Sequence, residues 1–109
     1  MQEVKTQSPI QKLVRLTAKP DLESELRTAL QILESATRAE PGCIEFTLLQ
    51  SISNDSLFVL LEHFADEDAF QAHMQLPHTR AFFRAQLVAS VEATDVSSLG
   101  SPGPAQSAG

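Results

Sequence analysis

The alternation of hydrophobic and polar residues predicts four β-strands. Apolar and β-branched side chains dominate four stretches, residues 10–18, 43–51, 57–64 and 87–96. In the second stretch, strict alternation places Ile44 on the same face as Phe46 and puts Cys43 on the opposite face. The polar link at residues 53–56 is typical of a turn, so the second and third strands are expected to form an antiparallel hairpin.

A first amphipathic helix is predicted between Pro20-Asp21 and Pro41-Gly42. Apolar residues recur there at spacings of three and four, and acidic residues occupy the first turn, where they favour the positive end of a helix. The segment Glu40-Pro41-Gly42 is expected to shape the turn into the next strand, with a geometric rather than a chemical role.

A second helix is predicted to begin after Asp66, which is a good N-cap residue. Leu76-Pro77-His78 interrupts it, and residues 78–86 predict a further helical turn or two. The side chains expected to face inward from these two segments are Ala69, Phe70, His73, Met74, Ala81, Phe82 and Ala85.

The order of these elements predicts an α+β fold. It reads β-α-β-β-α-β, the ferredoxin-like arrangement, with a four-stranded antiparallel sheet and the helices on one face. We expect one domain over residues 10–96, an N-terminal arm over residues 1–9 and a flexible tail over residues 97–109, which is rich in Gly, Pro and Ser.

The third strand carries large apolar side chains on both faces. Leu57, Val59 and Leu61 alternate with Phe58 and Leu60, a pattern typical of a strand that is buried on both sides. Because both helices cover the same face, the opposite face needs another cover. A second copy packed sheet to sheet would give a homodimer, and the alternative is cover by the arm or the tail.

Composition narrows the possible partners and compartments. The chain of 109 residues has a net charge of −6 and no basic cluster, which disfavours nucleic acid and anionic membrane surfaces. No apolar run is long enough to span a bilayer, and the first residues do not resemble a signal peptide. The single cysteine, Cys43, cannot form an internal disulfide, so we expect a cytoplasmic protein.

Glu62 is the most informative candidate for catalysis. Alternation places it on the apolar face of the third strand with Leu60 and Phe64. An unpaired charge there is costly, so Glu62 is expected to be paired, protonated or facing a wet cavity. A desolvated carboxyl can act as a base near neutral pH. The alternative is a structural ion pair with Arg15 or Arg38.

Two of the three histidines are further catalytic candidates. His73 lies on the inward stripe of the second helix, and imidazole suits proton transfer near pH 7. The alternative role for His73 is a hydrogen bond to a backbone carbonyl. His78 follows Pro77 and either closes the mouth of a pocket or caps the next helical segment. His63 is expected to face the other side of the sheet and the subunit interface.

Other chemical motifs are weak. His73 and His78 are separated by a proline and lack the spacing of a metal motif, so no metal site is expected. Cys43 is expected to be a small core residue rather than a nucleophile. The phenylalanines expected to form the walls of a pocket for a flat ligand, besides packing the core, are Phe46, Phe64, Phe70 and Phe82.

Three stretches resemble one protein family. They are Arg38-Ala39-Glu40-Pro41-Gly42-Cys43, the segment from Phe58 to Phe70 that contains Glu62-His63-Phe64, and His73 with Leu76-Pro77-His78 and Phe82. In this order they resemble the antibiotic biosynthesis monooxygenase (ABM) superfamily, in its quinol monooxygenase-like branch. The resemblance covers about residues 10–95 and implies a dimeric α+β barrel with a pocket between sheet and helices.

The resemblance also implies a range of activities. Some relatives oxygenate phenols, quinols or anthrones with O₂ and without metal or flavin, since the substrate supplies the electrons. The first hypothesis is therefore a cofactor-independent monooxygenase for a small aromatic substrate, in which Glu62 or His73 takes the proton. The chain contains no Trp and no Tyr, and Phe64 stands where many relatives have Trp. An isomerase-like enzyme, a ligand-binding dimer or a non-catalytic structural dimer remain alternatives.

Overall fold

The structure is a computed structural model, and it describes residues 8–96. The elements, in chain order, are β1 (Ile10–Ala18), α1 (Glu23–Arg38), β2 (Cys43–Gln50), β3 (Leu57–Phe64), α2 (Glu67–Gln75), α3 (Pro77–Arg84) and β4 (Val88–Asp95). All four predicted strands and the predicted helices are present. Most of the predicted arm and the whole predicted tail lie outside the described residues.

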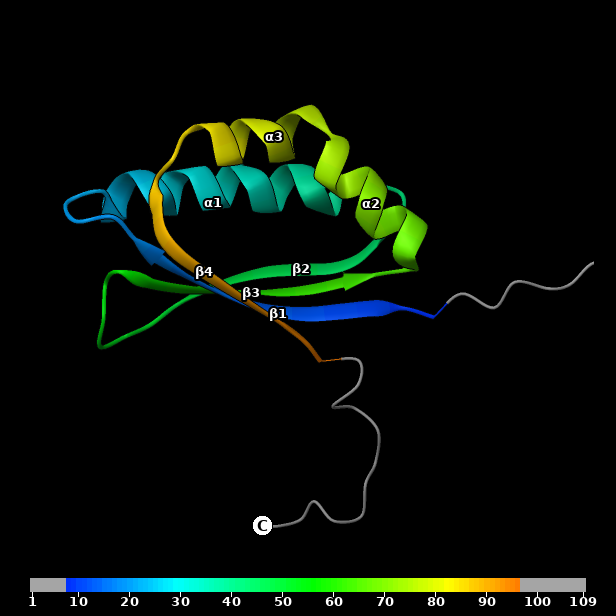
Figure 1. Cartoon of the computed structure of the whole chain (residues 1–109), viewed down its shortest axis with the longest axis horizontal. Helices are drawn as coiled ribbons and strands as arrows, with labels where there is room; N and C mark the ends of the chain where they lie inside the picture. The colour runs from blue at the N-terminus through cyan, green and yellow to red at the C-terminus, as the bar shows by residue number, and fades with distance from the viewer. Residues whose placement is uncertain (1–7, 97–109) are drawn as a thin grey trace, which may run out of the picture.

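The strands form one antiparallel sheet in the order β2-β3-β1-β4. Figure 1 shows α1, α2 and α3 together on one side of this sheet. The predicted ferredoxin-like α+β fold is confirmed, with the second helix divided into α2 and α3. Among the described residues, no helix has the length and apolar character that a membrane crossing requires.

The core lies between the sheet and α1. Alternate residues of β1 and β3 point toward the helices, among them Leu16 and Phe58, which are 2% and 0% exposed. From α1, Leu26 and Leu30 are fully buried against them. This matches the faces predicted from alternation and from helical spacing. Burial of such side chains stabilises the domain by about 1.5–3 kcal/mol each.

Strand β2 departs from the predicted alternation near its start. The register with β3 shifts between Cys43 and Glu45, so Cys43 pairs with Phe64 on the helix side while Ile44 is 58% exposed. The prediction that Ile44 shares a face with Phe46 was therefore wrong. A bulge adds one residue and reverses the faces of those before it.

Helix α3 also differs from the sequence prediction. Ala81 and Ala85 were expected to face inward, but both are exposed, and Thr79 is buried together with Phe82. The reason is Leu76, whose extended conformation (ψ 151°) ends α2 and starts α3 in a new direction. The inward face of α3 is therefore not a continuation of that of α2.

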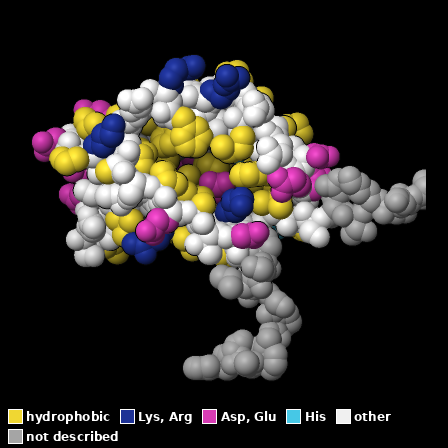
Figure 2. All heavy atoms as spheres, in the orientation of Figure 1, with side chains coloured by type: hydrophobic (Ala, Val, Ile, Leu, Met, Phe, Trp, Pro, Cys, Tyr) yellow, Lys and Arg dark blue, Asp and Glu magenta, His cyan; other side chains and the backbone are white. Residues whose placement is uncertain are grey.

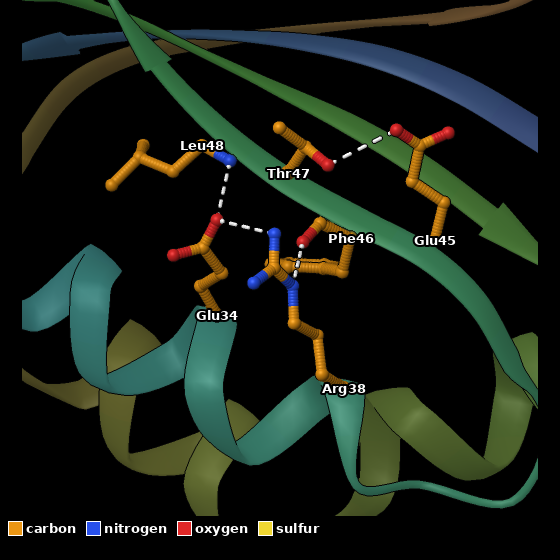
Figure 3. Close-up of polar contacts among 6 residues, drawn as sticks. All are labelled: Glu34, Arg38, Glu45, Phe46, Thr47 and Leu48. Carbon is orange, nitrogen blue, oxygen red and sulfur yellow. Dashed lines mark hydrogen bonds and ion pairs between the residues drawn. The ribbon is translucent and has the colours of Figure 1, made fainter.

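Polar side chains from α1 fasten the edge strand β2. Arg38 Nε donates to the Phe46 carbonyl at 2.9 Å, and the Leu48 amide donates to Glu34 Oε2 at 2.9 Å. Figure 3 shows these contacts, with Arg38 also paired to Glu34. An edge strand has unpaired backbone groups, and here two of them are satisfied by one helix face.

The face of the sheet away from the helices carries an apolar patch without any described helix over it (Figure 1). Register places Leu13, Val59, Leu61 and Leu49 on this face, in neighbouring rows. Leu49 is 47% exposed. His63 lies on the same face, as its alternation with Glu62 predicted.

Candidate functional site

A cavity of about 230 Å³ lies between the sheet and the three helices. Apolar side chains form most of its wall, and its polar groups are Lys12, Glu62, His73 and Thr79. Figure 2 shows a hollow ringed by hydrophobic side chains, with an acidic group inside it and a basic group beside it. Such a site is suited to a small, mostly apolar ligand.

Glu62 faces this cavity from β3. Burial raises the pKa of its carboxyl from the ordinary 4.5 to about 7, because desolvation disfavours the charged form. The ammonium of Lys12 acts in the opposite direction, and the carboxylate of Glu40 raises the pKa further. Glu62 therefore exchanges a proton readily near neutral pH.

The ion pair with an arginine that sequence reasoning allowed for Glu62 is not formed. Arg15 lies 3.9 Å from Glu92 on the outer part of the sheet, and Arg38 is held by Glu34. The cation whose charge acts on Glu62 is instead Lys12, its register partner on β1. Its Nζ lies 5.0 Å from the centre of the Phe70 ring, a distance at which the ring attracts the ammonium.

His73 lies on α2 and is 3% exposed. Its ring is stacked among Phe46, Phe64 and Phe70, with the Phe64 ring centre 4.9 Å away. The predicted inward position is confirmed. The alternative in which the ring bonds a backbone carbonyl is not what the structure shows, since the ring bonds a carboxylate.

That carboxylate belongs to Glu40. Glu40 Oε2 lies 2.9 Å from His73 Nδ1 and 2.5 Å from His78 Nε2, and the Glu40 side chain is 8% exposed. Because an ionised carboxylate only accepts, both ring nitrogens donate to the same oxygen. The side chain of Glu40 therefore joins two histidines in addition to lying in the turn, a contact that the predicted geometric role did not include.

Close packing at Gly42 brings Glu40 to α2. A Cβ at Gly42 would lie 2.3 Å from the Cβ of Ala69, so only glycine lets the first turn of α2 pack against this segment. The Gly42 carbonyl accepts a hydrogen bond from the Ala65 amide at 2.8 Å. Asp66 caps α2 through the Ala69 amide at 2.8 Å, as predicted.

The other residues predicted for the site fall into two groups, those that line the cavity and those that do not. Phe46, Phe70 and Phe82 line the cavity, whereas Phe64 does not and packs behind His73 instead. Phe83, which sequence reasoning did not select, also lines it. His78 lies outside the cavity wall and contacts Glu40.

Cys43 packs against the core, as predicted. Burial and the neighbouring carboxylates of Glu40 and Glu62 raise the pKa of its thiol. A raised pKa lowers the thiolate fraction, which argues against a nucleophilic role.

One carboxylate and two imidazoles meet beside the cavity, and His73 belongs both to this group and to the cavity wall. The ligand atoms of Glu40, His73 and His78 all lie within 4.8 Å of one another. The spacing of the histidines gave no indication of this group, because its carboxylate comes from a distant segment. The one available signal was that Glu40 belongs to the motif Glu40-Pro41-Gly42.

Comparisons with known proteins agree on one family. Residues 9–85 match the family described as "Antibiotic biosynthesis monooxygenase". The chain is 35% identical over 71 residues to "Putative monooxygenase Rv0793" of Mycobacterium tuberculosis, covering 65% of this chain and 69% of that protein. It is 30% identical over 67 residues to "Putative monooxygenase YcnE" of Bacillus subtilis, covering 62% and 70%.

Solved structures share the fold. PA3566 of Pseudomonas aeruginosa superposes with a TM-score of 0.77 at 27% identity, covering 84% of this chain and 94% of that chain. The structure of Rv0793 gives a TM-score of 0.73 at 30% identity, covering 80% and 91%. The sequence and the fold therefore point to the same group of proteins.

Proposed function

Since the chain belongs to the antibiotic biosynthesis monooxygenase family, we propose that it is a monooxygenase-like enzyme that oxygenates a small phenolic or quinol-type compound with O₂ and without a cofactor. The observation that carries this proposal is the convergence of Glu62 and His73 on one apolar cavity. Two proton-exchanging groups in a desolvated pocket are what removal of a phenolic or activated C–H proton requires.

The size of the cavity favours a compound of one or two rings. Its volume of about 230 Å³ exceeds the roughly 150 Å³ of an apolar cavity that holds benzene. The rings of Phe46, Phe70 and Phe82 in its wall offer faces and edges for a flat ligand. A three-ring substrate would extend past the exposed side chain of Phe83 toward solvent.

We assign the role of base to His73. Its Nδ1–H is held by Glu40, which leaves Nε2 as the acceptor. His73 lines the cavity, and we take Nε2 as the nitrogen available to a ligand bound there.

Glu40 is then a positioning residue. Its carboxylate fixes the tautomer of His73 and stabilises the imidazolium that forms when Nε2 accepts a proton. Glu62 with Lys12 provides the second proton-exchanging group, on the sheet side of the same cavity. A substrate between α2 and β3 would contact both.

The overall reaction balances with the substrate as the only reductant. A hydroquinone, C₆H₆O₂, and O₂ would give a hydroxyquinone, C₆H₄O₃, and water. The protein removes a proton to form the electron-rich anion that O₂ attacks, and the apolar wall shields that anion from water. One oxygen atom enters the ring, and the other leaves as water with two substrate hydrogens.

A second candidate function follows from the same pair of groups. Removal of a proton by His73 and its return by Glu62 would isomerise a small carbonyl compound without O₂. The absence of Tyr and Trp from the sequence favours this candidate, because it leaves few donors to hold a quinol oxygen. Oxygen consumption distinguishes the two reactions.

We also propose that the chain works as a homodimer. The patch formed by Leu13, Val59, Leu61 and Leu49 lies on the sheet face without helices. Apolar patches of this kind are commonly covered in soluble proteins, and a second copy supplies a complementary sheet.

The proposed reaction is tested with an oxygen electrode. Purified protein is mixed with one-ring and two-ring hydroquinones, naphthols and larger anthrones, and O₂ uptake is measured against protein-free controls. Uptake that requires His73, tested with His73→Asn, would support the oxygenase. Ligand binding with no O₂ uptake across this panel would exclude it and leave the isomerase-like or binding function.

A further inference from the structure

We propose that Glu40, His73 and His78 form a binding site for one divalent transition-metal ion of the zinc class. The bound ion determines whether the cavity-facing nitrogen of His73 accepts or donates a hydrogen bond. The site consists of Glu40 Oε2, His73 Nδ1 and His78 Nε2, all within 4.8 Å of one another. Nothing in the proposed oxygenation needs this ion, so the site adds a property to the protein.

The geometry is close to that of a three-ligand metal site. Zinc lies about 2.0–2.2 Å from imidazole nitrogen and carboxylate oxygen, which separates the ligand atoms by roughly 3.3–3.6 Å at the tetrahedral angle. The distance of 2.9 Å between Glu40 Oε2 and His73 Nδ1 must therefore lengthen by roughly 0.4–0.7 Å when an ion binds. The 2.5 Å contact to His78 must lengthen by about 1 Å.

His78 is the ligand that can move. Its side chain is 24% exposed, whereas those of His73 and Glu40 are 4% and 8% exposed. It is the second residue of α3, two positions after the extended residue Leu76. An ion can therefore approach from the side of His78, and water can complete the coordination there.

The surroundings favour a cation and fix the ligands. Two imidazoles and one carboxylate suit Zn²⁺, Fe²⁺, Co²⁺ and Ni²⁺ more than Mg²⁺ or Ca²⁺. A second carboxyl, that of Glu62, lies near enough for the charges of Glu40 and Lys12 to act on it. Thr79 Oγ1 lies 3.4 Å from His73 Nδ1 and the rings of Phe46 and Phe64 pack on His73, so its orientation is set before metal arrives.

Metal binding reverses the hydrogen-bonding character of His73 toward the cavity. Without metal, Nδ1 carries the hydrogen and donates to Glu40, and Nε2 accepts. A metal on Nδ1 takes its lone pair, so the ring hydrogen moves to Nε2, which becomes a donor. If His73 is the base proposed above, the bound ion switches that base off. The existence of the site does not depend on that proposal.

Metal binding is tested on the full-length, tag-free protein without any substrate. After dialysis against a chelator, Co²⁺ alone is titrated and its visible d–d absorption recorded, and Zn²⁺ is titrated by calorimetry. We expect one ion per chain. Glu40→Gln and His78→Gln should each weaken binding at least about a hundredfold, since loss of second-shell partners alone costs 10–100-fold. His63→Gln, on the opposite face, should bind as the unaltered chain does.

Two results would overturn the proposal. One is no Co²⁺ or Zn²⁺ binding by the folded chain, which would make the group a hydrogen-bonded trio only. The other is binding that His78→Gln and Glu40→Gln leave unchanged while circular dichroism shows that both variants are folded. O₂ uptake is measured separately with chelator present, so a failure of the metal site and a failure of the proposed reaction give different results.

Discussion

The carboxylate of Glu40 lies 2.9 Å from Nδ1 of His73, although 33 residues separate them in the chain. Both side chains are almost fully buried, at 8% and 4% exposed. A hydrogen bond to a buried charged group is worth about 1.5–3 kcal/mol, so this contact holds the imidazole in one orientation. The chemistry assigned to the cavity depends on that orientation.

Replacement of Glu40 by Gln should lower kcat/KM more than it alters the fold. The amide keeps the shape but loses the charge that stabilises the imidazolium, and a misplaced base costs about 10²–10⁴-fold in rate. The Nδ1–H of His73 would then donate to a neutral amide oxygen, so its resonance should move upfield in proton NMR spectra. Glu45→Gln, an exposed carboxyl on β2, is the control. Unchanged kcat/KM in Glu40→Gln would contradict a positioning role.

The free energy of unfolding of Glu62→Gln should exceed that of the unaltered chain by an amount that grows as the pH rises. The folded-state pKa of about 7 lies above the ordinary 4.5, so the folded protein holds the proton more tightly than the unfolded chain does. Stability is therefore lost as the pH rises from about 4.5 through 7, by up to about 3 kcal/mol. The Gln variant has no such loss.

Urea unfolding at pH 5 and pH 8 measures this effect. The free energy of unfolding of Glu62→Gln minus that of the unaltered chain should grow between the two pH values. Glu92→Gln, whose side chain is 76% exposed, should show no comparable change. An equal difference for Glu62→Gln at both pH values would mean that the carboxyl has its ordinary pKa.

Replacement of Gly42 by Ala should destabilise the protein by about 1–3 kcal/mol and shift α2 away from Glu40. The added methyl would lie 2.3 Å from the Cβ of Ala69. Adding Ala69→Gly removes that methyl and should recover part of the loss, despite the cost of about 1 kcal/mol for glycine in a helix. Denaturant titration of the single and double variants gives the coupling energy, and strictly additive effects would show that the two positions do not clash.

Replacement of Val59 by Glu should produce monomers. Val59 lies between Arg15 and Leu49 in the register of the sheet face without helices, and a buried charge at an interface is costly. Ile32→Glu is the matched control, since Ile32 is an apolar residue that is 63% exposed on the helix side. Sedimentation velocity at micromolar concentration should show a dimer for the control. A monomer for the unaltered chain would refute the dimer.

Substitutions of two phenylalanines should separate ligand binding from folding. Phe83 lines the cavity and is 53% exposed, so Phe83→Ala should weaken binding of a naphthol while changing the free energy of unfolding by less than about 1 kcal/mol. Phe64 is 0% exposed and outside the cavity wall, so Phe64→Ala should cost about 3–5 kcal/mol. Fluorescence titration and urea unfolding measure the two quantities, and a large loss of stability in Phe83→Ala would contradict its place in the wall.

Local patterns in the sequence were sufficient to predict the strands, the helices and the inward positions of Glu62 and His73. Alternation and helical spacing report on which face is buried, and burial is what organises this small domain. They failed at Ile44 and Cys43, where a bulge inserts a residue into β2. They also failed at Ala81, because the change of direction at the end of α2 resets the buried face.

The role of Glu40 lay beyond such patterns. A carboxylate before a Pro-Gly turn is ordinary in sequence, and only the approach of Gly42 to Ala69 brings it to α2. Because it follows Pro77, His78 was expected either to close the mouth of a pocket or to cap the next helical segment. In the structure it bonds Glu40 instead, since α3 begins at Pro77 in a new direction. Contacts between distant segments of this kind require the tertiary structure.

The corner at Leu76 determines how many residues can separate His73 from His78 if both rings are to reach one carboxylate. On an uninterrupted helix, positions 73 and 78 would point about 140° apart, and no single oxygen atom would reach both rings. The extended conformation of Leu76 cancels that divergence. A one-residue insertion or deletion here would turn His78 by about 100° relative to His73. Insertions and deletions at this corner should therefore be tolerated less well than substitutions of its residues.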